Sequence, residues 1–278
     1  MLDRLIFYFA TYPTVRYATV ALLLISVSAA LLGVTLVLRR FSMIGDGLSH
    51  VSFGAASVAT VMGLTTPMYL ALPITVIAAV LLLHIPRSSR VGGDAAVACV
   101  SAGSLAIGYL ILNLFPTPDG YTGDACANLF GRGILSISLN DVILCLALCT
   151  VLIVTFLLFY NRIFAATFDP DFAAATGARL SLYNTLSAII TGVVTVVAME
   201  LVGALLVAAL IVFPALSAMR IFKSFRSVSI FCVALSAICS TLGLAVSLLI
   251  STPVGSTVVC VDIVAFGVCY LIGTLRAK

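Results

Sequence analysis

Long apolar stretches follow one another along almost the whole chain, and this feature limits the possible folds more than any other. Nine of them lie near residues 18–38, 46–63, 67–84, 94–115, 140–160, 184–199, 201–219, 228–250 and 256–275. A helix of about 20 apolar residues crosses the ~30 Å hydrocarbon core of a membrane. The pattern therefore predicts an all-α protein: a polytopic integral membrane bundle in which residues 1–278 form a single transmembrane domain.

The number of spans stays open between eight and nine. The second stretch is interrupted by polar residues, and only Glu200 separates the sixth stretch from the seventh. Nine spans, or eight with one re-entrant or broken helix, are both compatible with this pattern.

Composition excludes several classes of protein. Hydrophobic residues make up 63% of the chain and charged residues only 9%, whereas a soluble domain is about 25% charged. This excludes a soluble enzyme. The 14 Lys and Arg residues are scattered and form no basic stripe of the kind that nucleic-acid-binding proteins show, so we expect no nucleic-acid partner. The run over 17–38 is longer than a signal-peptide core and indicates a retained span.

The positions of Lys and Arg indicate how the chain is oriented, because short loops rich in these residues stay in the cytoplasm. With nine spans and a cytoplasmic C-terminus, all Lys and Arg residues fall inside except Arg4, Arg16 and Arg132. The opposite orientation would reverse that bias. The Pro- and Gly-containing loop over 116–139 is then extracytoplasmic.

Asp46 and His50 are the strongest candidates for a site. They lie where a polar segment runs into the second apolar stretch, and an ionisable residue in a membrane segment is costly and therefore a functional hypothesis. Their spacing of four residues places both side chains on one face of a helix. A carboxylate oxygen with an imidazole nitrogen suits Mn²⁺, Fe²⁺ or Zn²⁺. Alternatively, Asp46 caps the helix and His50 binds a neighbouring carbonyl.

Three other ionisable residues lie in or beside apolar stretches. Glu200 either lines an aqueous path or marks a turn between two helices, and the residues alone do not decide between these. Asp262, inside the last stretch, is expected to be structural. His84, at the basic edge of a span, is expected to be interfacial.

The eight cysteines include no CxxC pair. All but Cys126, which lies in a polar loop, fall in apolar runs and are interpreted as small hydrophobic residues. Cys145 and Cys149 would share a helix face, so a soft metal site is conceivable there, although plain packing is the favoured interpretation.

The segment 168–177 contains the signals of a short helix of about two turns. Asp169 is a favoured N-cap, Pro170 suits the first helical position, Asp171 complements the helix N-terminus and Gly177 ends the helix. In a cytoplasmic loop, such a helix is either a docking surface for a partner protein or an ordinary loop helix.

The chain has no GxxxxGK[ST] phosphate loop, so any nucleotide-driven step needs another subunit.

Taken together, these motifs resemble those of the membrane-spanning permease subunits of bacterial metal-ion ABC importers of the ABC-3 type, which serve zinc, manganese and iron uptake. The resemblance covers nearly the whole chain. It is carried by segments 32–50, 129–141, 168–177, 202–215 and 252–257, in the order found in that family.

The resemblance implies roles for particular residues. Asp46 and His50 fall on the family's Gly-Asp-x-Leu-x-His motif, which is associated with metal coordination in the translocation path. The segment Asp169–Gly177 falls on the cytoplasmic coupling helix that contacts the ATPase. Glu200 departs from the Lys, Arg or Gln found at that position in many relatives, and could add a transient ligand.

The resemblance also implies partners. These are two ABC ATPase subunits, an extracytoplasmic metal-binding receptor and a second, identical or different, permease, all at the bacterial inner membrane. We expect no permanently bound cofactor, because the divalent metal is the transported substrate. The rival hypotheses are a secondary transporter or channel using Asp46, His50 and Glu200 as a relay, and an intramembrane enzyme using His50 with Glu200, which would lack a third ligand.

Overall fold

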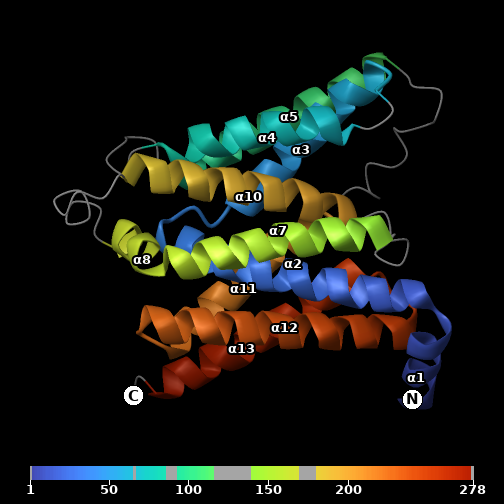
Figure 1. The fold of residues 1–278 in the computed structure, drawn as a ribbon, viewed down its shortest axis with the longest axis vertical. Coiled ribbons are helices and arrows are strands. Elements are labelled where there is room, and N and C mark those ends of the chain that lie inside the picture. Colours follow the sequence, from blue (N-terminus) through green and yellow to red (C-terminus); the bar gives the residue numbers. More distant parts are fainter. Residues whose placement is uncertain (1, 65–66, 86–92, 116–138, 169–179, 277–278) are drawn as a thin grey trace.

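A computed structural model of the chain describes residues 2–64, 67–85, 93–115, 139–168 and 180–276. All regular structure in these ranges is helical (Figure 1). The helices are α1 (Leu2–Thr11), α2 (Pro13–Leu38), α3 (Ile44–Val61), α4 (Met68–Leu83), α5 (Gly93–Leu114), α7 (Leu139–Leu158), α8 (Tyr160–Phe168), α10 (Leu180–Val202), α11 (Ala204–Ile221), α12 (Phe225–Ile250) and α13 (Val254–Arg276).

Each apolar stretch of the sequence corresponds to one of these helices, namely α2, α3, α4, α5, α7, α10, α11, α12 or α13. Among the described residues, six helices are long and apolar enough to cross a membrane: α2, α5, α10, α11, α12 and α13. The apolar parts of α4 and α7 are shorter. The predicted all-α polytopic bundle is therefore confirmed, and the choice between eight and nine spans stays a prediction.

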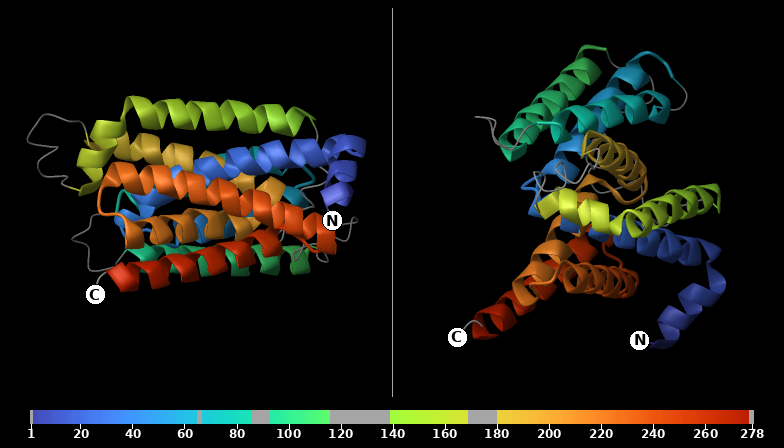
Figure 2. Two further views of the ribbon diagram at one scale, coloured as in Figure 1. Left: turned by 90° about the horizontal axis from the view of Figure 1, so that it is seen from below. Right: turned by 60° about the vertical axis from the view of Figure 1, so that its left-hand side comes forward.

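The core of the bundle lies where α2 and α11 meet. The long helices run side by side, and α1 turns away from them at the N-terminal end (Figures 1 and 2). α2 packs against α7, α11 and α12. Large, fully buried side chains come from both central helices, including Leu22 and Leu36 of α2 and Leu206, Leu210 and Ile211 of α11.

The outer helices expose the opposite surface. Large apolar side chains point outward from α5, α7 and α13, among them Leu110, Leu157, Leu158 and Leu271. A soluble protein rarely exposes apolar surface on this scale, whereas a membrane protein presents it to lipid. The fold is thus that of a multi-pass membrane protein.

The break between α10 and α11 occurs at Gly203, not at Glu200. Gly203 has φ 92 and ψ 154, a backbone region that is essentially restricted to glycine. Glu200 still belongs to the last turn of α10. The prediction that Glu200 separates the sixth and seventh stretches is therefore wrong, because the backbone geometry of glycine, rather than charge, ends the helix.

Candidate functional site

The turn between α2 and α3 fixes where the predicted metal pair begins. Arg40 has a left-handed backbone conformation with φ 62, and the Phe41 backbone N–H donates to the Leu36 carbonyl at 3.0 Å. This arrangement ends many helices and usually places glycine at the position of Arg40, where a side chain costs roughly 1–2 kcal/mol. The Phe41 side chain is buried. It holds the turn against the bundle, so that α3 starts from a defined position.

The N-terminal end of α3 is also attached to α5. The Asp94 carboxylate accepts a hydrogen bond from the Met43 backbone N–H at 3.2 Å. The first N–H groups of a helix lack partners within the helix, so a neighbouring carboxylate stabilises this end. Asp94 is not among the residues singled out from the sequence. Its one signal is that it directly follows two glycines at the start of an apolar stretch.

Asp46 and His50 form an ion pair on α3, with Nε2 of His50 3.5 Å from Oδ1 of Asp46. Both side chains are partly exposed. The structure therefore brings the predicted pair together, and the alternative in which His50 binds a carbonyl is not the arrangement seen. The neighbouring Ser49 hydroxyl donates its hydrogen bond to the Gly45 carbonyl at 2.7 Å, within α3 rather than to the pair.

Among the residues that the structure describes, no group of three or more His, Cys, Asp or Glu side chains could together hold a metal ion. The pair thus supplies one oxygen and one nitrogen ligand. A transition metal held there would complete its coordination with water or with groups from elsewhere.

Glycines bring α3 into close contact with the helices on either side. A Cβ atom on Gly54 would lie 2.7 Å from the Ser104 carbonyl oxygen of α5. On the other flank, a Cβ on Gly45 would lie 2.7 Å from the Ile211 side chain of α11. Small residues permit such helix packing in membranes. α3 therefore packs closely against both α5 and α11.

Asp46 and His50 are the partly exposed residues in the first two turns of α3. Leu48, on the opposite side of the helix, is buried, and so are Phe53 and Ser57, which lie further along the same side as the pair because a helix turns 100° per residue. At the start of α3, the described part of this chain therefore leaves the helix partly open only around the pair.

Glu200 is exposed in the last turn of α10. The preceding residue, Met199, packs against Phe53 of α3 and Leu112 of α5. This end of α10 consequently lies beside the helix that carries the ion pair, although Glu200 does not join the pair in a metal-binding cluster of described residues.

Asp262 lies inside α13 and is only 2% exposed. Its carboxyl group lies near the Cys239 thiol of α12, and Oδ2 has no hydrogen-bond partner among the described residues. This placement, enclosed between helices, agrees with the structural role predicted for Asp262.

The remaining predicted residues divide into those placed and those outside the described ranges. Cys145 and Cys149 of α7 are both buried, a position typical of cysteines that pack as small hydrophobic residues. His84 is exposed, its Nδ1 2.8 Å from the Val80 carbonyl and its Nε2 3.2 Å from the Thr185 hydroxyl. Cys126 lies outside the described residues.

The predicted coupling segment, with Asp169, Pro170, Asp171 and Gly177, also lies outside the described residues. The helix before it, α8, and the start of the helix after it, α10, lie at the same end of the bundle as the C-terminus (Figure 1). The coupling role of these residues stays a prediction.

Known proteins resemble this chain over most of its length. The "Manganese import system permease protein ScaB" of Streptococcus parasanguinis is 25% identical over 261 residues, which cover 94% of this chain and 91% of that protein. The "Probable iron transport system membrane protein" of Haemophilus influenzae is 28% identical over 242 residues, covering 87% and 84%. A chain in the solved structure "PsaBC from Streptococcus pneumoniae in complex with Fab" has the same fold, with a TM-score of 0.82 at 23% identity over 97% of this chain and 95% of that one.

The family comparison agrees with these likenesses. Residues 11–273 match the ABC 3 transport family, so the match runs from the end of α1 into the last turn of α13 and includes the α3 pair. With helical architecture, fold and sequence match in agreement, the chain belongs to the ABC 3 transport family.

Proposed function

We propose that the chain is the membrane-spanning permease subunit of an ATP-driven importer for a divalent transition metal. Mn²⁺ is the first candidate, and Zn²⁺ and Fe²⁺ are the alternatives. The observation that carries the proposal is the Asp46–His50 pair on α3, an ionisable pair in a bundle built mainly of apolar helices. Names of similar proteins that refer to manganese or iron support the class of substrate.

The chemistry of the pair suits passage rather than storage. One carboxylate and one imidazole attract a divalent ion, and their separation of 3.5 Å lets both approach one point. Manganese accepts oxygen and nitrogen ligands. Because two ligands leave most coordination positions to water or other groups, the ion is bound weakly enough to leave again, as conduction requires.

The partly open start of α3 is the proposed meeting place with a second permease, identical or different. Two copies would bring two such pairs to one path, and the second pair would fill coordination positions that the first leaves vacant. Glu200, beside α3 at the end of α10, is the proposed further contact in this path. A carboxylate there would attract a cation before or after it meets His50.

The energy is proposed to come from separate ABC ATPase subunits, since the sequence contains no phosphate loop. These subunits would dock on the segment with Asp169, Pro170, Asp171 and Gly177. A metal-binding receptor would deliver the ion on the outer face of the bacterial inner membrane. The metal is substrate here, and no permanently bound cofactor is proposed.

Uptake measurements test this proposal directly. The chain is reconstituted in proteoliposomes with its ATPase and its loaded receptor, and uptake of radioactive Mn²⁺ and Zn²⁺ is followed in parallel, with and without ATP. We expect ATP-dependent uptake of one of the two ions. His50→Ala should lower that uptake by about tenfold or more, the scale on which loss of one interaction with the ion is felt.

Two further results would decide between the proposal and its rivals. Uptake that does not respond to ATP would favour a secondary transporter or channel and contradict the proposal. An Asp169→Ala/Asp171→Ala variant that folds but loses ATP-dependent uptake would support docking of an ATPase on that segment. Unchanged uptake in the same variant would contradict this docking role.

A further inference from the structure

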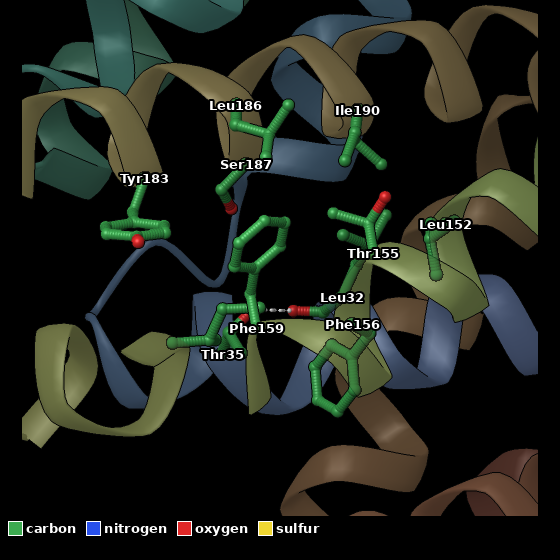
Figure 3. A pocket seen from close by; sticks show the side chains of 11 residues that line it. Leu32, Thr35, Leu152, Thr155, Phe156, Phe159, Tyr183, Leu186, Ser187 and Ile190 are labelled. Carbon is green, nitrogen blue, oxygen red and sulfur yellow. Dashed lines mark hydrogen bonds between the residues drawn. The ribbon is translucent and has the colours of Figure 1, made fainter. Parts of the chain in front are cut away.

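A groove lies between α2, α7, α8 and α10. The groove is shallow and open on one side, and its enclosed part holds about 30 Å³, more than the ~10–15 Å³ that one water molecule needs. Its floor includes Leu32 and Thr35 of α2, and its walls include Leu152, Phe159 and Ser187 (Figure 3).

The groove exists because α7 packs mainly on α2 and has only a limited contact with α10. Ser187, a small residue on the α10 wall, leaves the space unfilled, and Phe159 extends toward it from the end of α7 (Figure 3). Because the groove is shallow and open on one side, it suits a thin occupant such as an alkyl chain, part of which stays outside the groove.

The lining accepts an apolar guest. Two of its hydroxyl groups are already used within their own helices, since Thr35 donates to the Leu32 carbonyl at 2.8 Å and Thr155 donates to the Val151 carbonyl at 2.7 Å. Leu152, Phe156 and Ile190 supply hydrocarbon surface. A sugar or a nucleotide would find few free polar partners here, whereas an alkyl chain needs none.

A positively charged side chain, Arg162, lies at one edge of this apolar space. Arg162 of α8 is exposed, and its guanidinium donates a hydrogen bond to the hydroxyl of Tyr183, a lining residue. The guanidinium carbon also lies 5.6 Å from the centre of the Tyr183 ring. Arginine binds phosphate through paired N–H groups. The groove therefore combines a hydrocarbon interior with a held phosphate-binding group.

The surroundings identify the source of such a ligand. α7 exposes Val151, Val154, Leu157 and Leu158, so the groove opens beside the surface that faces lipid. The same end of the bundle holds Arg39 and Arg40 after α2 and Arg220 and Lys223 at the end of α11. Basic pockets between helices at such an end suit anionic lipid headgroups.

We propose that this groove binds an anionic phospholipid, with an acyl chain between α7 and α10 and its phosphate on the Arg162 guanidinium. The bound lipid fills the space between α7 and α10 and fastens α8 to α10. The lipid is thus part of the folded protein rather than a passing neighbour, and its role is independent of which ion is transported.

The test uses the full chain, purified from membranes with the subunits that accompany it and placed in nanodiscs of phosphatidylcholine with or without phosphatidylglycerol. Lipid retained after transfer to detergent is counted by mass spectrometry, and the thermal midpoint is measured in each lipid. We expect phosphatidylglycerol to be retained about fivefold over phosphatidylcholine, the preference one arginine near a membrane surface provides.

Three variants separate the parts of the proposal. Arg162→Gln should remove the preference for phosphatidylglycerol, and Arg162→Lys should restore most of it. Ser187→Leu should fill the groove and lower retention of both lipids, with the thermal midpoint showing that it folds. Arg226→Gln is the matched control, since Arg226 is exposed at the start of α12, away from the groove lining.

The proposal is overturned if Arg162→Gln retains phosphatidylglycerol as the unchanged chain does, or if Arg226→Gln loses the preference equally. Stabilisation by glycerol phosphate as large as that by phosphatidylglycerol would identify a site for soluble phosphate instead. Unchanged retention in a folded Ser187→Leu variant would place the acyl chain elsewhere and likewise contradict the proposal.

Discussion

Asp46 and Asp262 are two carboxylates carried by helices of the same bundle, and their surroundings differ in almost every respect. Asp46 is partly exposed, near the start of α3, and pairs with His50. Asp262 is deep inside α13, in contact with the Cys239 thiol, and one of its oxygens has no partner among the described residues. The comparison shows that a charged residue type in a membrane segment does not by itself define a site.

The two settings have different physical consequences. A carboxylate beside an imidazole on an open face can exchange its partner for a metal ion with little reorganisation. A carboxylate enclosed by helices cannot be reached by a hydrated ion unless the helices separate, and a charge buried there would be costly. We therefore expect transport to depend on Asp46, whereas Asp262 matters for packing alone.

The largest expected effect comes from neutralising each carboxylate with minimal change in shape. Asp46→Asn should lower ATP-dependent metal uptake by about tenfold or more, because it removes the negative ligand. Asp262→Asn keeps the shape of the side chain and a polar group beside the Cys239 thiol, and should leave uptake within about twofold. Uptake in proteoliposomes checks both. Equal losses in the two variants would remove the distinction between an open and an enclosed carboxylate.

Close helix contacts at two glycines, Gly54 of α3 and Gly243 of α12, offer a second comparison. A Cβ on Gly54 would lie 2.7 Å from a backbone oxygen of α5, and one on Gly243 would lie 2.6 Å from the backbone of Val258 in α13. Gly54→Ala and Gly243→Ala should each lower the free energy of unfolding by about 1–3 kcal/mol through overpacking. Only Gly54→Ala should also change the KM for the metal.

The matched control for both is Gly103→Ala, because a Cβ on Gly103 of α5 would have no described atom within 4 Å. In a helix this change should raise stability by up to about 1 kcal/mol. Thermal unfolding of the purified variants measures these differences. A Gly54→Ala variant as stable as Gly103→Ala would contradict the close contact of α3 with α5.

A third change sharpens the interpretation of Asp262. Asp262→Leu replaces a buried carboxyl group whose Oδ2 has no hydrogen-bond partner among the described residues, so we expect the free energy of unfolding to rise by about 1 kcal/mol. Denaturation of the detergent-solubilised protein measures this. A marked loss of stability or of uptake would instead show that the carboxyl group is needed in another state of the transporter.

The smallest expected effect is at the start of α3. Asp94→Ala removes the acceptor for the Met43 N–H, and loss of such a cap costs about 0.5–2 kcal/mol. Asp94→Asn retains an acceptor and should lose less. Hydrogen exchange at the first turn of α3 is the sensitive measurement. Exchange in Asp94→Ala as slow as in the unchanged chain would argue against the cap.

The sequence was sufficient for the nine apolar helices and for the pair on α3, because both depend on neighbours close in the chain, but it did not indicate the short helices α1 and α8. Apolar runs indicate helices one by one, and a spacing of four residues already places Asp46 beside His50. Contacts between distant segments leave no such local pattern. The thiol beside Asp262 comes from Cys239 on another helix, and the Asp94 cap joins residues 51 positions apart.

The end of α10 illustrates the same limit within a short segment. A charged residue is the more visible interruption in a run of apolar letters, so Glu200 was the expected boundary. The actual break needs a backbone conformation that is essentially restricted to glycine, and Gly203 supplies it. A local pattern of hydropathy does not carry information about φ and ψ.

Gly203 also has a consequence for how this gene can vary. Gly63, with φ 73, stands just after α3, and a Cβ atom there would meet no described atom within 4 Å. A saturation-mutagenesis library should therefore recover Asn or Asp at position 63, because both tolerate a left-handed backbone. Gly203 combines its positive φ with an extended ψ, which excludes even those two residues. Every missense codon at position 203 should be depleted under selection, whereas several at position 63 should survive.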